Sequence, residues 1–245
     1  MKPLIVILFA CFCLAVQSQT CIIIYVSSKG ITAGADRKYH EVLISTDTKT
    51  AKQQKTFKVH YGKKIFSRNN CFWAMSGADY YDTIHAICSQ ACNPNLSLQK
   101  IISNIRKRLQ TKQVKNAMHE LLSNSDKVQK ERFKGNLTEI AFFKFDSNAY
   151  KAYRITLFMP GIYNNDETLH FDTDSIVATR KTLGVFVLGH YGAFEKNMDP
   201  EKWVDPVTTI RMLIKKQSAS TPEEVSAESD IISITKVKYE WIKNN

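Results

Sequence analysis

The chain has 245 residues, which suits one large domain or two small ones and is enough to bury a substantial core. With 44% hydrophobic and 23% charged residues, and only 9 glycines and 6 prolines, it has the composition of a globular protein and not of a collagen-like or low-complexity chain. The formal charge of +11 comes without a nucleic-acid-binding motif. We therefore interpret it as a lysine-rich solvated surface and expect no nucleic-acid partner.

The first residues have the pattern of a secretory signal peptide. Lys2 provides a positive start, residues 4–16 are apolar, and residues 17–19 are polar. An apolar run of this length is too short to span a bilayer comfortably. We therefore expect residues 1–19 to be removed and residues 20–245 to form a single exported domain, secreted or periplasmic, with no integral membrane segment.

The position of the cut is open from sequence alone. Small residues favour a cut after Ser18, which leaves Gln19 at the terminus. A cut after Gln19 exposes Thr20 directly, and the mature terminus is thus Gln19, Thr20 or Cys21. A third alternative is lipoprotein processing at Cys11, because the residues before it loosely resemble a lipobox.

Four cysteines lie beyond the expected signal peptide: Cys21, Cys71, Cys88 and Cys92. In an oxidising compartment they allow three disulfide connectivities, among which sequence does not choose. Cys88 and Cys92 are one helical turn apart, a spacing that permits a local bridge. The additional His/Cys ligands of a zinc site are missing, so we expect no metal and no cofactor.

Strand patterns dominate the first third of the chain. Apolar, β-branched residues predict strands over 20–26 and 31–35, joined by a glycine-containing turn into a hairpin that ends at Asp36. The polar stretch 46–55 is expected to form an exposed loop. Two further strands are expected over 56–67 and 71–76.

Helical and then strand patterns follow. Residues 78–92 are expected to be helical, and apolar residues at helical spacing predict an amphipathic helix from about Ser97, with Ser97 or Asn95 as its N-cap and helical character towards Phe133. The remaining expected elements are strands over 137–145, 150–157, 182–188, 231–235 and 238–242 and a helix over 206–216. Because strands and helices are segregated, the order favours an α+β fold with two antiparallel sheets packed face to face and helices outside.

Thr20 opens the first strand at the expected processing junction. An N-terminal threonine carries a hydroxyl nucleophile and, on the same residue, an α-amine that can act as its base. The pKa of such an amine is near ~8 and falls further beside a lysine ammonium, which a carboxylate must then hold in place. The hairpin can return Asp36 to the N-terminus for that task.

The segment TCIIIYVSSKGITAGADRK resembles the start of a mature proteasome β-type subunit, a member of the N-terminal-nucleophile (Ntn) hydrolases. The resemblance implies that Thr20 is the nucleophile and that Asp36, in the same small-small-Asp context, is the acidic partner. The lysine of the family precedes a β-branched residue, and Lys64 in GKKIF matches it if about a dozen residues are inserted before it. Lys63 and Lys52 are the alternatives.

The resemblance continues at CFWAMSGADYYD, where it implies that the Gly77 N–H is the oxyanion-hole donor at the start of the first helix. In GHYG, His190 replaces the serine that the family has near the terminal amine. EEVSAESD lacks the paired glycine of the family, so the accompanying Asp and Ser cannot be placed. The resemblance covers nearly the whole mature chain in element order, although only its first sixty or so residues carry specific motifs.

This resemblance implies a four-layer αββα sandwich and a threonine-type peptidase or amidohydrolase that cleaves peptides or small amides. It leaves oligomerisation open. Cys21 is a competing nucleophile, because some Ntn hydrolases use an N-terminal cysteine. His190 and the altered C-terminal motif also fit a catalytically inactive binding protein on the same scaffold.

Overall fold

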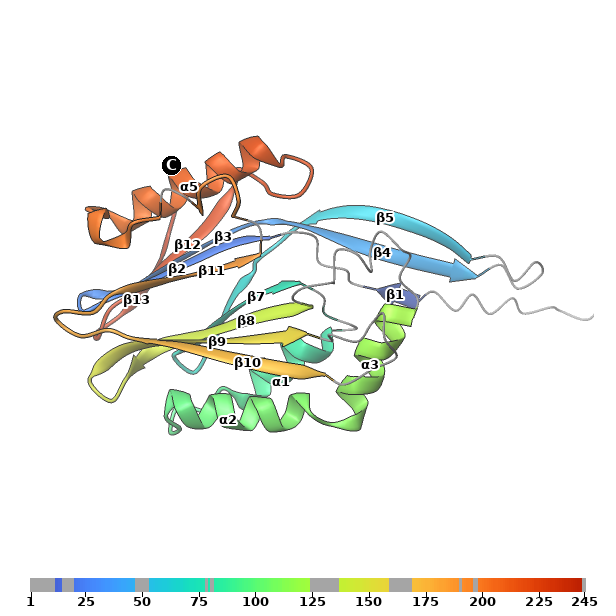
Figure 1. Ribbon diagram of the computed structural model, residues 1–245, viewed down its shortest axis with the longest axis horizontal. Coiled ribbons are helices and arrows are strands. Elements are labelled where there is room, and N and C mark those ends of the chain that lie inside the picture. The colour runs from blue at the N-terminus through green and yellow to red at the C-terminus, as the bar shows by residue number, and fades with distance from the viewer. Residues whose placement is uncertain are drawn as a thin grey trace, which may run out of the picture.

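A computed structural model describes residues 12–14, 20–46, 53–77, 79, 82–123, 137–158, 169–189, 191–195 and 198–243 of the chain. These residues form two five-stranded sheets, a three-stranded sheet and several helices (Figure 1). Every strand pair is antiparallel. The chain therefore has a mixed helix and strand content with antiparallel sheets, as its element order predicts.

The first five-stranded sheet contains the N-terminal hairpin. Its strands, in spatial order, are β11 (Gly184–Gly189), β2 (Cys21–Ser27), β3 (Gly30–Asp36), β12 (Ser229–Ile234) and β13 (Tyr239–Ile242). Ile22 lies opposite Ala35, so the open end of the hairpin brings the start of β2 next to Asp36. The hairpin expected from the sequence is thus confirmed.

The second five-stranded sheet has the spatial order β10 (His170–Val177), β9 (Ala149–Phe158), β8 (Thr138–Asp146), β7 (Cys71–Gly77) and β6 (Ile65–Arg68). Asn69 and Asn70 connect β6 to β7 with φ angles of 53° and 56°. Two successive left-handed residues make the tight turn that matches the twist of a hairpin, and asparagine tolerates that conformation.

The three-stranded sheet consists of β1 (Phe12–Leu14), β4 (Lys38–Thr46) and β5 (Gln53–Tyr61), and β4 and β5 extend beyond the two larger sheets (Figure 1). The expected loop over 46–55 was too long, because β4 continues to Thr46 and β5 starts at Gln53. Backbone pairing of a hairpin does not require an apolar pattern, which explains the error. β1 falls within the expected signal peptide, whose removal stays a prediction.

Helices cover the outer faces of the two larger sheets (Figure 1). The α-helices are α1 (Thr83–Ala91), α2 (Leu98–Leu109), α3 (Lys112–Ser123) and α5 (Pro206–Ser220), and a 3-10 turn, η3, covers Pro200–Lys202. Ser97 caps α2 as predicted, since its side chain accepts the Lys100 N–H. In the part of the chain that the structure describes, no helix is both long and apolar enough to cross a membrane.

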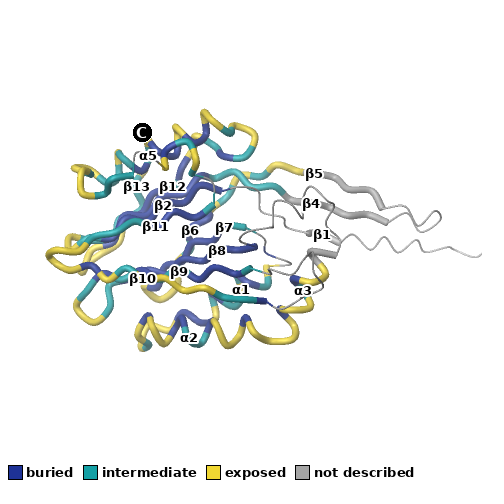
Figure 2. Tube along the Cα trace, in the orientation of Figure 1, coloured by how far each residue is buried: buried dark blue, intermediate teal, exposed yellow. Residues whose placement is uncertain are grey.

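The alternation of side chains in β2 and β7 explains the layering. Phe72 and Ala74 of β7 join Ile22 and Ile24 of β2 in one cluster between the sheets. The side chains that alternate with them in sequence point to the other face of each sheet, towards the helices. Trp73 and Met75 belong to the apolar cluster beneath α1 and α2, and Cys21 and Ile23 belong to the apolar cluster beneath α5. Figure 2 shows the burial concentrated in these strands. Each fully buried Ile or Phe contributes about 1.5–3 kcal/mol, so this packing fixes the end of β2 firmly.

Candidate active site

Asp36 lies at the centre of a buried polar cluster at the open end of the β2–β3 hairpin. Its side chain is 0% exposed. Oδ1 accepts hydrogen bonds from the Cys21 backbone N–H at 2.8 Å and from Lys64 Nζ at 2.9 Å. Oδ2 accepts from the N–H groups of Lys38 at 3.0 Å and Ser226 at 3.3 Å. The four hydrogen bonds compensate the free-energy cost of burying the carboxylate. They also join four segments of the chain, one of which begins at Cys21, the residue after Thr20.

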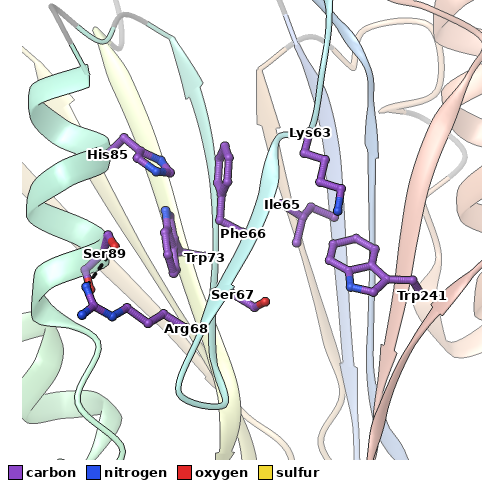
Figure 3. Close-up of a pocket in the computed structure, with 9 residues that line it drawn as sticks. All are labelled: Lys63, Ile65, Phe66, Ser67, Arg68, Trp73, His85, Ser89 and Trp241. Atoms are coloured by element: carbon purple, nitrogen blue, oxygen red, sulfur yellow. Dashed lines mark hydrogen bonds between the residues drawn. The ribbon is translucent and has the colours of Figure 1, made fainter.

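The lysine bound to Asp36 is Lys64, whose side chain is 2% exposed. Burial lowers the pKa of Lys64 below its ordinary value, and the Asp36 carboxylate acts against that shift. Lys63 points the other way and places its Nζ 5.1 Å from the Trp241 ring centroid (Figure 3). Of the two adjacent lysines, the structure therefore brings only Lys64 to Asp36, while Lys52 lies outside the described residues.

Thr20 is fully buried beside the left-handed Gly189. Gln19 precedes it in the sequence. Gly189 has a φ of 80°, and a Cβ added to it would overlap the Thr20 carbonyl oxygen and lie 2.6 Å from Ser76 Oγ. Thr20 and the Ser76 side chain near the end of β7 thus both lie against Gly189, at a point where only glycine fits.

The change Gly189→Ala is expected to destabilise the protein by about 2–4 kcal/mol, because a left-handed backbone strains any side chain and the new methyl group displaces Thr20. Urea unfolding followed by circular dichroism measures the change. Gly192→Ala is the matched control, since nothing lies within 4 Å of a Cβ at that position. Equal effects of the two changes would contradict the close contact with Thr20.

Gly77 ends β7 with a φ of 99°, and a Cβ on it would overlap the Leu137 carbonyl oxygen. The expectation that it starts the first helix is wrong, because α1 begins only at Thr83. Asp79 accounts for the difference: it accepts the N–H groups of Ile84 at 2.8 Å and His85 at 3.1 Å, which anchors the start of α1 after a connecting segment. The Gly77 N–H therefore lies at a strand end and not at a helix dipole.

Two residues of this cluster were not predicted from the sequence. Ser226 donates its N–H to Asp36 and accepts the Arg37 N–H at 3.0 Å. Glu139, 8% exposed on β8, accepts the Gly189 N–H at 2.8 Å and holds that glycine against Thr20. An acidic residue within an otherwise apolar strand was the available signal for Glu139, whereas EEVSAESD offered no positional signal for Ser226. His190 lies outside the described residues.

Cys21, the alternative nucleophile, is buried with its side chain in the α5 cluster. Burial raises the pKa of the Cys21 thiol, the Asp36 carboxylate raises it further, and Lys64 only partly counteracts them. The thiolate is the reactive form of cysteine, so this environment keeps Cys21 in its unreactive form.

An open pocket of about 410 Å³ lies beside the cluster, against the edge strand β6 (Figure 3). On one side Phe66 stacks on Trp73 and His85 packs edge-on against Phe66, and on the other side lie Lys63 and Trp241. The described ranges contain no group of three or more His, Cys, Asp or Glu residues arranged to hold a metal ion.

No family model matches the chain, and neither does any of the curated proteins. Among solved structures, the chain is similar to "Anbu (Gly-1) mutant from Hyphomicrobium sp. strain MC1", with 11% sequence identity and a TM-score of 0.48. The match covers 92% of this chain and 88% of that chain. A likeness of this size carries no conclusion about chemistry.

Proposed function

We propose that this protein is an exported Ntn hydrolase of the proteasome-β-like type that cleaves amide bonds with Thr20 as its N-terminal nucleophile. One observation carries the proposal: a single carboxylate oxygen, Asp36 Oδ1, binds both the buried Lys64 ammonium and the backbone N–H next to Thr20. An ion pair with a purely structural role can stay in contact with water. A lysine that has to lower the pKa of the Thr20 α-amine needs a buried position, where water does not screen its charge.

The proposed reaction has two halves. The Thr20 α-amine takes the proton of its own Oγ, and Oγ attacks the carbonyl carbon of the amide. The tetrahedral intermediate then collapses, the amine of the substrate leaves with that proton, and an ester on Thr20 remains. Water, deprotonated by the same α-amine, hydrolyses the ester, releases the carboxylic acid and restores the free hydroxyl.

The surrounding groups have distinct roles in this proposal. The Lys64 ammonium lowers the pKa of the α-amine by like-charge repulsion, and Asp36 holds the lysine there. We assign the Gly77 N–H as the oxyanion donor, which the proximity of β7 to β2 and of Ser76 to the Thr20 carbonyl supports. Glu139 acts through Gly189, whose position it fixes.

We also infer that the sheets and helices form the αββα sandwich of Ntn hydrolases. The apolar cluster shared by β2 and β7 supports two face-to-face sheets. The separate clusters beneath α5 and beneath α1 and α2 support a helical layer on each outer face (Figure 1).

N-terminal sequencing and intact-mass measurement of the protein released by the expressing cell test the proposal most directly. The expected mature terminus is Thr20, because an amine acylated by Gln19 cannot accept a proton. The same sample should gain the mass of one threonine-directed peptide electrophile per chain. A stable Gln19 terminus, or a lipid on Cys11, would overturn the proposal.

A further inference from the structure

Two buried cysteines meet where the second sheet contacts α1, away from the cluster around Asp36. Cys71 is the first residue of β7 and is 0% exposed, and Cys92 is the residue that follows α1 and is 4% exposed. Both are free thiols in the structure, and both belong to the same buried apolar cluster, where a hydrogen-bonding interaction with Cys71 lowers the pKa of Cys92. The fold therefore places the two side chains in one part of the core.

Hydrogen bonds on both sides of the pair fix the backbone around it. The Asn69 side chain donates to the Cys92 carbonyl at 3.2 Å, which fastens the β6–β7 turn to the end of α1. Arg68, which lies opposite Cys71 in the hairpin, donates to the Ser89 carbonyl at 3.2 Å (Figure 3). Because these bonds tie the turn to the helix end, the backbone segments that carry Cys71 and Cys92 are held next to each other.

The three neighbouring cysteines differ in reactivity. The hydrogen bond from Cys71 lowers the pKa of Cys92, and the positive charges of Arg68 and Lys144 lower it further against the effect of burial. The hydrogen bond to Cys92 and burial raise the pKa of Cys71. Burial also raises the pKa of Cys88 well above its ordinary value. Cys92 is thus the thiol that attacks first, because it is the one of the three whose pKa is lowered.

We propose that Cys71 and Cys92 form an intrachain disulfide when the protein meets a disulfide oxidant such as oxidised glutathione. The Cys92 thiolate attacks one sulfur of the oxidant, forms a mixed disulfide and releases one glutathione thiol. Cys71 then loses its proton and attacks the Cys92 sulfur, which releases the second glutathione thiol. Two protein thiols are oxidised and one oxidant disulfide is reduced, so electrons and protons balance.

The bridge would join the start of β7 to the end of α1. Closing a loop of this length should raise the Tm by roughly 5–10 °C. This proposal does not depend on hydrolase activity, and it selects one pairing among those that the sequence leaves open.

The test uses two samples of the full-length chain. The first is reduced and folded and then receives oxidised glutathione, and the second is refolded in a mixture of reduced and oxidised glutathione. Remaining thiols are alkylated under denaturing conditions, and the peptides are mapped without reduction. Trypsin leaves all three cysteines in one peptide, because no Lys or Arg lies between Arg68 and Lys100. Chymotrypsin separates Cys71 from the other two after Trp73 and Tyr81.

The expected result is a Cys71–Cys92 cross-link with Cys88 alkylated, together with the rise in Tm. Cys88→Ser should keep both, and Cys92→Ser should lose both. A Cys88–Cys92 bridge, a stable mixed disulfide with glutathione, or alkylation of all three cysteines in both samples would overturn the proposal. Peptide mapping of the protein without substitutions tests the proposed disulfide even if a variant fails to fold.

Discussion

Replacing Lys64 by methionine is expected to lower the free energy of unfolding by about 3–5 kcal/mol. The lysine and Asp36 are 2% and 0% exposed, so neither charge is screened by water. Methionine preserves most of the side-chain volume but leaves the carboxylate buried without its cationic partner. Urea unfolding of the purified variant at neutral pH measures the loss.

Two further variants separate the ion pair from general packing effects. Lys63→Met is the matched control, because that lysine is exposed over Trp241, and it should cost less than about 1 kcal/mol. Adding Asp36→Asn to Lys64→Met removes both charges, and the double variant should be more stable than the sum of the two single effects predicts, by about 1 kcal/mol or more. Simple additivity would show that the two side chains do not interact.

The sequence predicted the parts of the site that lie on local patterns. Thr20, Asp36 and the hairpin between them follow from β-branched residues around a glycine turn, and the structure joins the two ends of that hairpin as expected. Lys64 was preferred over Lys63 because, like the lysine of the family that the chain resembles, it precedes a β-branched residue. Burial separates the two lysines, since Lys64 is 2% exposed and bound to Asp36, whereas Lys63 lies over the Trp241 ring.

Three features were missed or wrongly predicted from the sequence, each for a different physical reason. Ser226 reaches Asp36 across nearly the whole chain length, and no local signal marks that contact. Gly77 was placed at a helix start because CFWAMSGADYYD resembles the family segment in which the glycine opens the first helix, but the Asp79 carboxylate anchors the helix at Thr83. Strand β10 is mostly exposed and polar, so its residues lack the apolar pattern by which a strand is recognised.

Thr20→Ala is expected to abolish amide hydrolysis, with a fall in turnover of at least roughly 10³-fold, because no other group in the proposed mechanism can form the ester. Thr20→Ser keeps a hydroxyl and an α-amine and should retain measurable turnover. A panel of fluorogenic peptide amides, assayed with each variant after N-terminal sequencing, measures the difference. The folded state of each variant is checked by its thermal transition.

Cys21→Ala distinguishes Thr20 from the competing nucleophile. If the chemistry belonged to Cys21, this variant would lose turnover and Thr20→Ala would keep it, which would contradict the proposal. The N-terminus of the Thr20→Ala protein shows in addition whether the chain cleaves itself. If the hydroxyl of Thr20 itself cleaves the bond to Gln19, the alanine variant should retain Gln19 while the unmodified protein begins at Thr20. A terminus at residue 20 in both proteins would instead show that an external peptidase makes the cut, and Thr20 would then act only on substrate.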